Sequence, residues 1–336
     1  MSRTGRVLTL LCLLVAATAQ AGQHCPFDPE PPIASLPVGT DIGFSVAVPG
    51  FEGDPVWGGR SVFAHLPGTL TAGELRPLLV ALHGAAGSPG GATVQAARAR
   101  DLWRESADRG GFFVIAPAAS GASGSWVAPI TPTDHPSDYD RILAAIDYLA
   151  RQQPIDPERI YLWGFSAGGH VALDIALNRP HPHLHSEMFA GFAVHAGVSA
   201  GLACSGLSST ECAARVFSGA ASKRPVSVHI GNSDPLLAFA LEDRMRFQNF
   251  GWLTGANFFW QLFGGGHTVL AEQPAEVWNQ LCAFSTRPAG KLPARPSLDL
   301  PTLPTEAESE RSVGRASAGD RKRNQRPRLA SPAAAD

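Results

Sequence analysis

Cysteine, charged residues and long apolar runs are all scarce in this 336-residue sequence. Five cysteines occur, without a Cys-x-x-Cys pair or a Cys/His set at metal-ligand spacing, which argues against a structural zinc site. Charged residues make up 17% and hydrophobic residues 44%, the balance of an ordinary globular protein. Beyond the first 21 residues no apolar run approaches the length of a membrane span, so we expect no transmembrane helix.

The first 21 residues have the layout of a signal peptide. Arg3 and Arg6 give a positive start, residues 7–17 form a short apolar run, and Ala-Gln-Ala at 19–21 supplies small residues for cleavage. An uncleaved N-terminal anchor is the alternative interpretation. The pattern predicts that residues 1–21 are removed and that the protein is secreted or periplasmic.

Cleavage would leave an even number of cysteines: Cys25, Cys204, Cys212 and Cys282. In an exported chain such a set favours disulfides, and four cysteines allow three pairings. Because Cys204 and Cys212 lie eight residues apart in a polar stretch, we predict a local bridge between them, and a second bridge between Cys25 and Cys282. Free buried thiols are the alternative if the chain is not exported.

Charge and composition divide the mature chain into three parts. Residues 22–40 are rich in proline and polar side chains and predict an irregular lead-in, and residues 41–290 predict one catalytic domain. Residues 22–290 carry 16 Lys and Arg against 23 Asp and Glu, so nucleic-acid binding is disfavoured. Residues 291–336, with 9 basic and 6 acidic residues, predict a disordered tail, which is either a solvated end or an attachment to anionic polymers.

Apolar strand patterns alternate with helical patterns along residues 41–290, which predicts an α/β fold with a mostly parallel central sheet and helices on both faces. Continuous apolar runs such as 78–82 and 112–116 are typical of strands buried on both faces. The predicted strands are 42–48, 60–66, 78–82, 112–116, 160–163, 191–194, 226–230 and 257–263. The predicted helices are 92–108, one capped by Ser137 and Asp138, 167–178, 236–250 and 274–284.

The sequence Gly-Phe-Ser-Ala-Gly at 164–168 fits the G-x-S-x-G turn, which exposes a serine hydroxyl between a strand and a helix. A second match, Gly-Val-Ser-Ala-Gly at 197–201, centres on Ser199. Ser166 follows an apolar strand and opens a helical pattern, whereas Ser199 runs into a segment rich in glycine and serine. The prediction is therefore that Ser166 is the nucleophile.

The loop His83-Gly84-Ala85 follows the strand at 78–82 directly. Acyl transfer develops negative charge on a carbonyl oxygen, which backbone N–H groups stabilise. The N–H groups of Ala85 and Ala167 are our candidates for this oxyanion hole, and a glycine-rich turn without chemistry is the alternative. His83 is expected to support the loop.

Hydrolases with this turn carry an acid and then a histidine after later strands. His267 follows the last predicted strand, and Asp234 follows the strand at 226–230, so they complete a predicted Ser166–His267–Asp234 triad; Asp243 is the alternative acid. Trp126, in the loop after the strand at 112–116, is a candidate substrate-binding side chain. The remaining candidates are assigned structural roles. His181, His183 and His185 are predicted to lie in a surface turn, and His195 and His229 in the core. Asp138 and Asp140 are predicted to lie at a helix N-terminus.

Taken together, these residues resemble the secreted α/β-hydrolases similar to polyhydroxybutyrate depolymerases and feruloyl esterases. The matching stretches are Leu-Val-Ala-Leu-His-Gly at 79–84, 107–112, Ser125-Trp126, 154–161, 164–169, 231–234 and Gly266-His267. The resemblance covers about residues 60–285, and the lead Ile-Asp-Pro-x-Arg-Ile-Tyr is its most specific part. It implies extracellular hydrolysis of carboxylic esters through an acyl-enzyme, without cofactor or metal.

Two differences from the resembled family affect the expected substrate. No segment after residue 290 has the pattern of a polymer-binding domain, and Thr268 and Val269 follow His267 where many relatives have an aromatic residue. Soluble esters or oligomers are therefore the expected substrates, among them hydroxyalkanoate oligomers, feruloyl esters and short acyl esters. A serine peptidase on the same fold and a non-catalytic binding protein are the alternatives.

Overall fold

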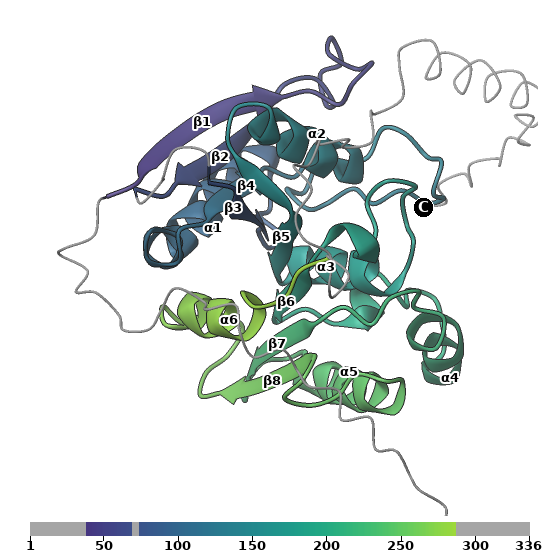
Figure 1. Cartoon of the computed structure of the whole chain (residues 1–336). Helices are drawn as coiled ribbons and strands as arrows, with labels where there is room; N and C mark the ends of the chain where they lie inside the picture. Colours follow the sequence, from purple (N-terminus) through teal and green to yellow (C-terminus); the bar gives the residue numbers. More distant parts are fainter. Residues whose placement is uncertain (1–37, 69–73, 287–336) are drawn as a thin grey trace, which may run out of the picture.

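A single eight-stranded sheet forms the centre of the computed structural model, which describes residues 38–68 and 74–286. The strand order is β1-β2-β4-β3-β5-β6-β7-β8, from the top of Figure 1 to the bottom. β1 and β4 both pair antiparallel with β2, and every other neighbouring pair is parallel. The predicted mostly parallel α/β sheet is therefore confirmed.

The elements alternate along the chain as strand and helix. The strands are β1 Thr40–Val46, β2 Arg60–Leu66, β3 Arg76–Leu82, β4 Phe113–Pro117, β5 Ile155–Phe165, β6 Gly191–His195, β7 Val226–Gly231 and β8 Phe258–Phe263. The helices are α1 Pro89–Gly110, α2 Asp138–Ala150, α3 Ala167–Leu177, α4 Ser209–Cys212, α5 Leu237–Asn249 and α6 Gln273–Leu281. Short helical turns occupy η2 Ser186–Met188, η3 Ser199–Gly201 and η4 Ala213–Phe217.

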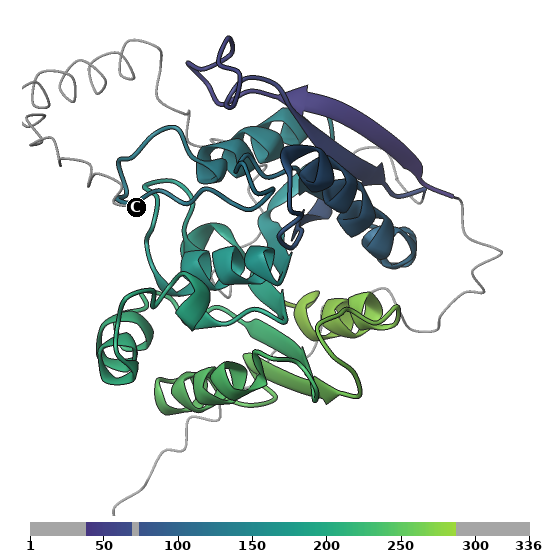
Figure 2. The same ribbon diagram turned by 180° about the vertical axis from the view of Figure 1, so that it is seen from behind.

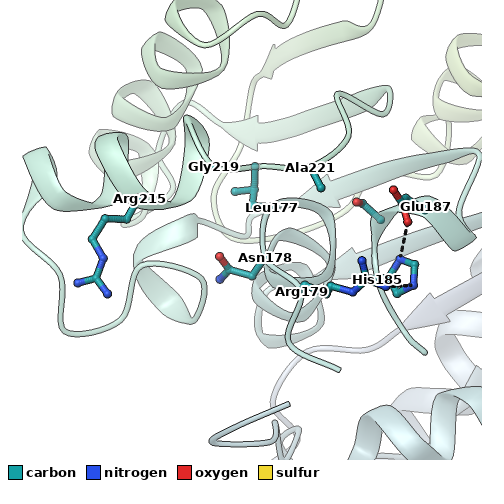
Figure 3. Close-up of a pocket in the computed structure, with 9 residues that line it drawn as sticks. Leu177, Asn178, Arg179, His185, Glu187, Arg215, Gly219 and Ala221 are labelled. Carbon is teal, nitrogen blue, oxygen red and sulfur yellow. Dashed lines mark hydrogen bonds and ion pairs between the residues drawn. The ribbon is translucent and has the colours of Figure 1, made fainter. Parts of the chain in front are cut away.

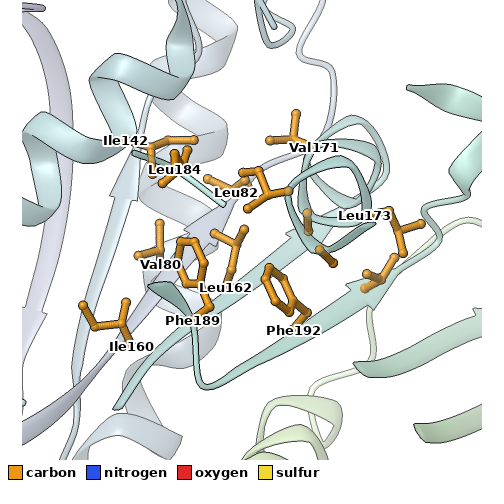
Figure 4. Packing of buried hydrophobic residues seen from close by; sticks show 14 of the residues in the cluster. Val80, Leu82, Ile142, Ile160, Leu162, Val171, Leu173, Leu184, Phe189 and Phe192 are labelled. Atoms are coloured by element: carbon orange, nitrogen blue, oxygen red, sulfur yellow. The ribbon is translucent and has the colours of Figure 1, made fainter. Parts of the chain in front are cut away.

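Helices cover both faces of the sheet, as predicted (Figures 1 and 2). One apolar cluster joins α2, α3 and α5 to one face, and a second joins α1 and α6 to the other. Because the strands alternate their side chains between the faces, Val80 and Leu82 of β3 point into the first cluster with Leu162 of β5 (Figure 4). Burial on both faces explains why these strands read as continuous apolar runs.

Side-chain caps define where α1 and α2 begin. The Ser88 side chain accepts a hydrogen bond from the Gly91 N–H at the start of α1, and Gly111 ends that helix with a φ of 61°. Ser137 and Asp140 form a capping box at the start of α2. Both helices begin just beyond the carboxyl end of a strand, so their caps help to shape the edge of the sheet that carries the candidate site.

Every predicted strand and helix is present, with shifts of a few residues at the ends. The largest shift is in β5, which begins at Ile155 instead of residue 160 and has an irregular register against β3 between Arg76 and Leu78. α4 and η4 were not predicted, because their sequence has no clear apolar period.

One of the two predicted disulfides is observed. Cys204 and Cys212 are bonded across eight residues. Cys25 lies outside the described residues, as do the predicted signal peptide and tail, so the Cys25–Cys282 pair stays a prediction. In the part of the chain that the structure describes, no helix combines the length and apolar character that a membrane crossing requires.

Candidate active site

The predicted nucleophile lies in a strained turn between β5 and α3. Ser166 has φ 51° and ψ −115°, a conformation that is costly for a residue with a side chain. Its N–H donates to the carbonyl of His195 at the end of β6, 2.9 Å away. A Cβ at Gly164 would lie 2.1 Å from the Gly168 carbonyl oxygen, and one at Gly168 would lie 2.3 Å from that of Leu82. Glycine at both positions therefore allows the sharp turn that presents Ser166.

The structure brings the three predicted triad residues together. The Ser166 Oγ and the His267 Nε2 are 2.8 Å apart, and the His267 Nδ1 and the Asp234 Oδ2 are 2.9 Å apart. The side chain of His267 is one-third exposed, whereas that of Asp234 is fully buried. The other Asp234 oxygen accepts the Leu236 N–H at 2.8 Å, which fixes the carboxylate for its contact with the imidazole.

The loops that carry the acid and the histidine are bonded to each other. Ser233 N–H donates to the Gly265 carbonyl at 2.8 Å, and Asn232 N–H donates to the Phe263 carbonyl at 2.9 Å. A Cβ at Gly231 would lie 2.4 Å from the carbonyl oxygens of Gly265 and Gly266, so glycine allows this close approach. Parallel pairing of β7 with β8 thus places both loops at the carboxyl edge where β5 presents the serine.

Ser199 and Asp243, the alternative serine and the alternative acid, are hydrogen-bonded to each other. Ser199 is fully buried, and its N–H and hydroxyl donate to the two oxygens of Asp243 at 2.6 and 2.5 Å. Arg246 donates to the same carboxylate at 2.8 Å. Burial raises the pKa of Asp243. This network joins η3 to α5, and neither residue belongs to the contact chain of Ser166.

The two candidate oxyanion donors flank the serine. Ala167 is the first residue of α3, where a helix N–H has no acceptor within the helix. Ala85 lies in the loop after β3, and no hydrogen bond joins its N–H to another described residue. A Cβ at Gly84 would lie 3.2 Å from the Ser166 Cβ, so this loop runs directly beside the nucleophile. Both N–H groups are therefore available to an oxygen bound at Ser166.

His83 forms hydrogen bonds that fix the loop after β3, as its expected supporting role requires. The Ala119 N–H donates to its Nε2 at 3.1 Å, so the neutral ring carries its proton on Nδ1, which donates to the Gly84 carbonyl at 2.6 Å. Burial lowers the pKa of His83, which favours this neutral form. The Trp126 Nε1–H donates to the His83 carbonyl at 2.8 Å. Trp126 thus contacts the loop of residues 83–88, which contains the candidate donor Ala85, and its sequence position alone did not reveal this contact.

Two histidines and one aspartate approach the spacing of a metal site. Ligand atoms of His135, Asp140 and His181 all lie within 4.8 Å of one another. His181 is buried, which makes the prediction of a surface turn wrong for this residue. Its Nδ1 accepts the backbone N–H groups of residues 183 and 184, so its Nε2 carries the proton and donates to Asp140 at 2.9 Å. A metal ligand needs that nitrogen unprotonated, and the cluster therefore fits a hydrogen-bonded structural role better.

A pocket of about 140 Å³ lies at the opposite end of α3 from Ser166 (Figure 3). Its lining includes His185 and Glu187, whose Nδ1 and Oε2 atoms are 3.7 Å apart. None of its lining residues belongs to the candidate triad. An 11-residue helix spans roughly 16 Å, so this pocket is remote from the proposed chemistry. The lining residues are Leu177, Asn178, Arg179, His185, Ser186, Glu187, Arg215, Gly219 and Ala221.

Solved structures with the same arrangement of strands and helices decide the fold. A feruloyl esterase module from Clostridium thermocellum superposes with a TM-score of 0.53 over 74% of this chain and 88% of its own, at 13% identity. A ferulic acid esterase gives a TM-score of 0.51 over 73% and 97% of the two chains, at 16% identity. The chain has the α/β-hydrolase fold. The Prolyl oligopeptidase family model matches residues 105–223 of this chain, a range that includes Ser166.

Sequence relatives resemble this chain over shorter segments. An esterase from Nocardia uniformis subsp. tsuyamanensis is 34% identical over 140 residues, which are 39% of this chain and 36% of the relative. A poly(3-hydroxyalkanoate) depolymerase from Paucimonas lemoignei is 28% identical over 145 residues, 42% of this chain and 32% of the relative. The matched segment thus spans about a third of each relative.

Proposed function

We propose that this chain is a carboxylic ester hydrolase that acts through an acyl-enzyme on Ser166. The observation that carries the proposal is the contact chain from Asp234 through His267 to Ser166, at 2.9 and 2.8 Å, on the turn between β5 and α3. Nucleophile, base and orienting acid in this geometry are the arrangement that activates a serine hydroxyl.

The proposed reaction begins when the Ser166 Oγ attacks the ester carbonyl carbon and its proton passes to the His267 Nε2. Asp234 accepts the Nδ1–H of the imidazolium and stabilises its charge. The N–H groups of Ala85 and Ala167 donate to the oxygen anion of the tetrahedral intermediate. When the intermediate collapses, the proton moves from His267 to the departing alcohol, and a water molecule then releases the acid by the same steps.

Small and oligomeric esters are the proposed substrates. The relatives are named as an esterase and a poly(3-hydroxyalkanoate) depolymerase, and two structural neighbours are named as feruloyl esterases. Their names support hydroxyalkanoate oligomers, feruloyl esters and short acyl esters as classes to test. The proposed reaction uses no metal or cofactor, since the chain, the ester and one water molecule account for every proton and bond change.

A serine peptidase is the second candidate, favoured by the match of residues 105–223 to the Prolyl oligopeptidase family. The same triad can attack an amide carbonyl, so the contact distances alone do not separate the two activities. The matched range contains Ser166 but neither Asp234 nor His267. A peptide substrate therefore belongs in the same assay as the esters.

The test compares purified wild-type protein with Ser166→Ala on p-nitrophenyl acetate and butyrate, methyl ferulate, a hydroxybutyrate oligomer and a peptide p-nitroanilide. Ser199→Ala is the matched control, because it alters the serine of the other G-x-S-x-G sequence. We expect ester hydrolysis in the wild type and in the folded control, and a loss of about 10⁶-fold in kcat in Ser166→Ala. Hydrolysis of the peptide alone would favour the peptidase, and no turnover would favour the non-catalytic binding protein.

We further propose that the protein is exported. The signal-peptide pattern of residues 1–21 motivates this, and the Cys204–Cys212 bond supports it because disulfides persist in oxidising compartments. Expression of the full chain fused to a periplasm-dependent reporter tests it. Retention of the precursor in the cytoplasm would contradict the proposal.

A further inference from the structure

We propose that Trp126 and Asp138 are positioning residues for the oxyanion hole, acting through His83 to aim the Ala85 N–H at the reacting oxygen. This inference rests on the proposed ester hydrolysis. It differs from the prediction that Trp126 contacts the substrate, which stays a prediction.

The hydrogen bond from His83 orients the Gly84–Ala85 peptide. A trans peptide is planar, and its C=O and N–H point in opposite directions. The His83 Nδ1–H donates to the Gly84 carbonyl at 2.6 Å. Because this bond fixes the carbonyl, it also fixes the direction of the Ala85 N–H on the other side of the plane.

Hydrogen bonds from Ala119 and Trp126 hold His83 itself. The Ala119 N–H donates to its Nε2 at 3.1 Å, and the Trp126 Nε1–H donates to its carbonyl oxygen at 2.8 Å. The rings of His83 and Trp126 are 4.9 Å apart, and the Trp126 ring packs against both apolar clusters of the core. Trp126 therefore joins the oxyanion loop to the rigid interior, with its only hydrogen-bond donor used for that contact.

Asp138 anchors the segment that carries Trp126. Asp138 is fully buried, and its carboxylate accepts the Ser120 N–H at 3.1 and 3.2 Å and the Val127 N–H at 2.8 Å. The Asp138 N–H in turn donates to the Val127 carbonyl at 2.9 Å. One carboxylate thus holds both ends of residues 120–127.

A further bond joins the middle of that segment to the oxyanion loop. The Ala86 N–H, next to the proposed donor Ala85, bonds to the Gly124 carbonyl at 3.2 Å. A Cβ at Gly124 would lie 2.3 Å from the Ser88 carbonyl oxygen, so the two loops are in close contact there. An unbroken series of hydrogen bonds and packing contacts therefore connects Asp138 to Ala85.

The experiment separates positioning from substrate contact. Trp126→Phe keeps an aromatic ring and removes the Nε1–H. Trp252→Phe is the matched control, because the Trp252 Nε1–H also donates to a backbone carbonyl at 2.8 Å, that of Arg224, in the core beside α5. A chain with 3-benzothienylalanine at position 126, which replaces only the N–H by sulfur, serves if Trp126→Phe does not fold.

For Trp126→Phe we expect a fall of about tenfold in kcat, smaller than the loss caused by removing an oxyanion donor itself, with KM nearly unchanged. The inhibition constant of a boronic acid that forms a tetrahedral adduct should rise by the same factor, and Trp252→Phe should change neither. A raised KM with unchanged kcat and boronic-acid affinity would overturn the inference and restore Trp126 as a pocket wall.

Hydrogen exchange of residues 83–88 gives a measurement that does not depend on turnover. It should be faster in Trp126→Phe than in the wild type and in Trp252→Phe, because the oxyanion loop has lost its contact with the interior. Unchanged exchange would contradict the positioning role. Failure of the wild type to hydrolyse any ester would instead contradict the proposed function, so the two failures are distinguishable.

Discussion

The His267 Nε2 lies 2.8 Å from the Ser166 Oγ, although 101 residues separate the two in the chain. The sheet creates this contact, since β5, β7 and β8 are parallel and end at the same edge. Ser166 leaves β5 in a strained turn, and His267 follows β8 in a glycine-rich loop. The candidate chemistry is thus a consequence of strand order and direction.

The choice between the two candidate acids is directly testable. Asp234→Asn should lower kcat by about 10⁴-fold with little loss of stability, because the amide cannot hold the His267 tautomer as the carboxylate does. Asp243→Asn should mainly lower the free energy of unfolding, since it disturbs the bonds from Ser199 and Arg246. Steady-state kinetics and urea unfolding of both variants measure this. A large kcat loss confined to Asp243→Asn would reverse the assignment.

The strain at Ser166 predicts a difference between two inactive variants. Glycine adopts a φ of 51° more readily than alanine, whereas both lack the hydroxyl. Ser166→Gly should therefore be more stable than Ser166→Ala by about 1 kcal/mol, after the entropy cost of glycine. Chemical unfolding of the pair checks it. Equal stabilities would show that the turn is not strained at this residue.

The Cys204–Cys212 bond should stabilise the segment that follows β6. Closing a loop with a separation of eight residues stabilises the folded state by about 2.5 kcal/mol on the chain-entropy model. The double variant Cys204→Ser/Cys212→Ser should lose about this much in unfolding free energy. Under reducing conditions the wild type and the variant both lack this bond, so their unfolding free energies should then be equal, which is the control. A loss below about 0.5 kcal/mol would contradict a structural role.

We predict that two buried histidines, His195 and His229, lower the stability of the protein in acid. His195 and His229 stack with ring centroids 4.4 Å apart, and the His229 Nε2 lies 2.9 Å from the Ser227 hydroxyl. Burial lowers the pKa of His229 to about 4 and that of His195 well below its ordinary value. The unfolded chain therefore binds more protons between the ordinary value of 6.5 and about 4, and stability falls as pH falls through that window.

Urea unfolding between about pH 7 and pH 5 measures this effect, with a slope of up to about 1.4 kcal/mol per pH unit for each histidine. His229→Gln removes one of the two contributions and should flatten the profile relative to the wild type. The other titrating groups are common to both proteins, so the difference reports the loss of His229 together with its effect on the pKa of the neighbouring His195. Parallel profiles would contradict the prediction.

Much of the fold was accessible from the sequence because its signals are local. Continuous apolar runs indicate the buried parallel strands, and Ser137 with Asp138 indicates a helix start. The residues after each serine distinguish Ser166 from Ser199, since a helical pattern succeeds the first and a glycine-rich segment the second. Their opposite environments, a turn beside His267 and a buried bond to Asp243, agree with that distinction.

Contacts made by backbone groups could not be predicted from the sequence. The bonds from Ala119 and Trp126 to His83 depend on how the loop after β4 folds back, and no residue type there encodes it. The burial of His181 depends on Asp140, 41 residues earlier in the chain. Such long-range polar pairs leave no periodic signal in the sequence.

The proposed mechanism requires that Ser166 carries the acyl group during turnover. The most direct measurement is rapid acid quenching of the enzyme during hydrolysis of p-nitrophenyl butyrate, followed by peptide mass spectrometry. We predict one butyryl group on the peptide that contains Ser166, and none in Ser166→Ala. Turnover without acylation of Ser166, or an acyl group on another residue, would contradict the account.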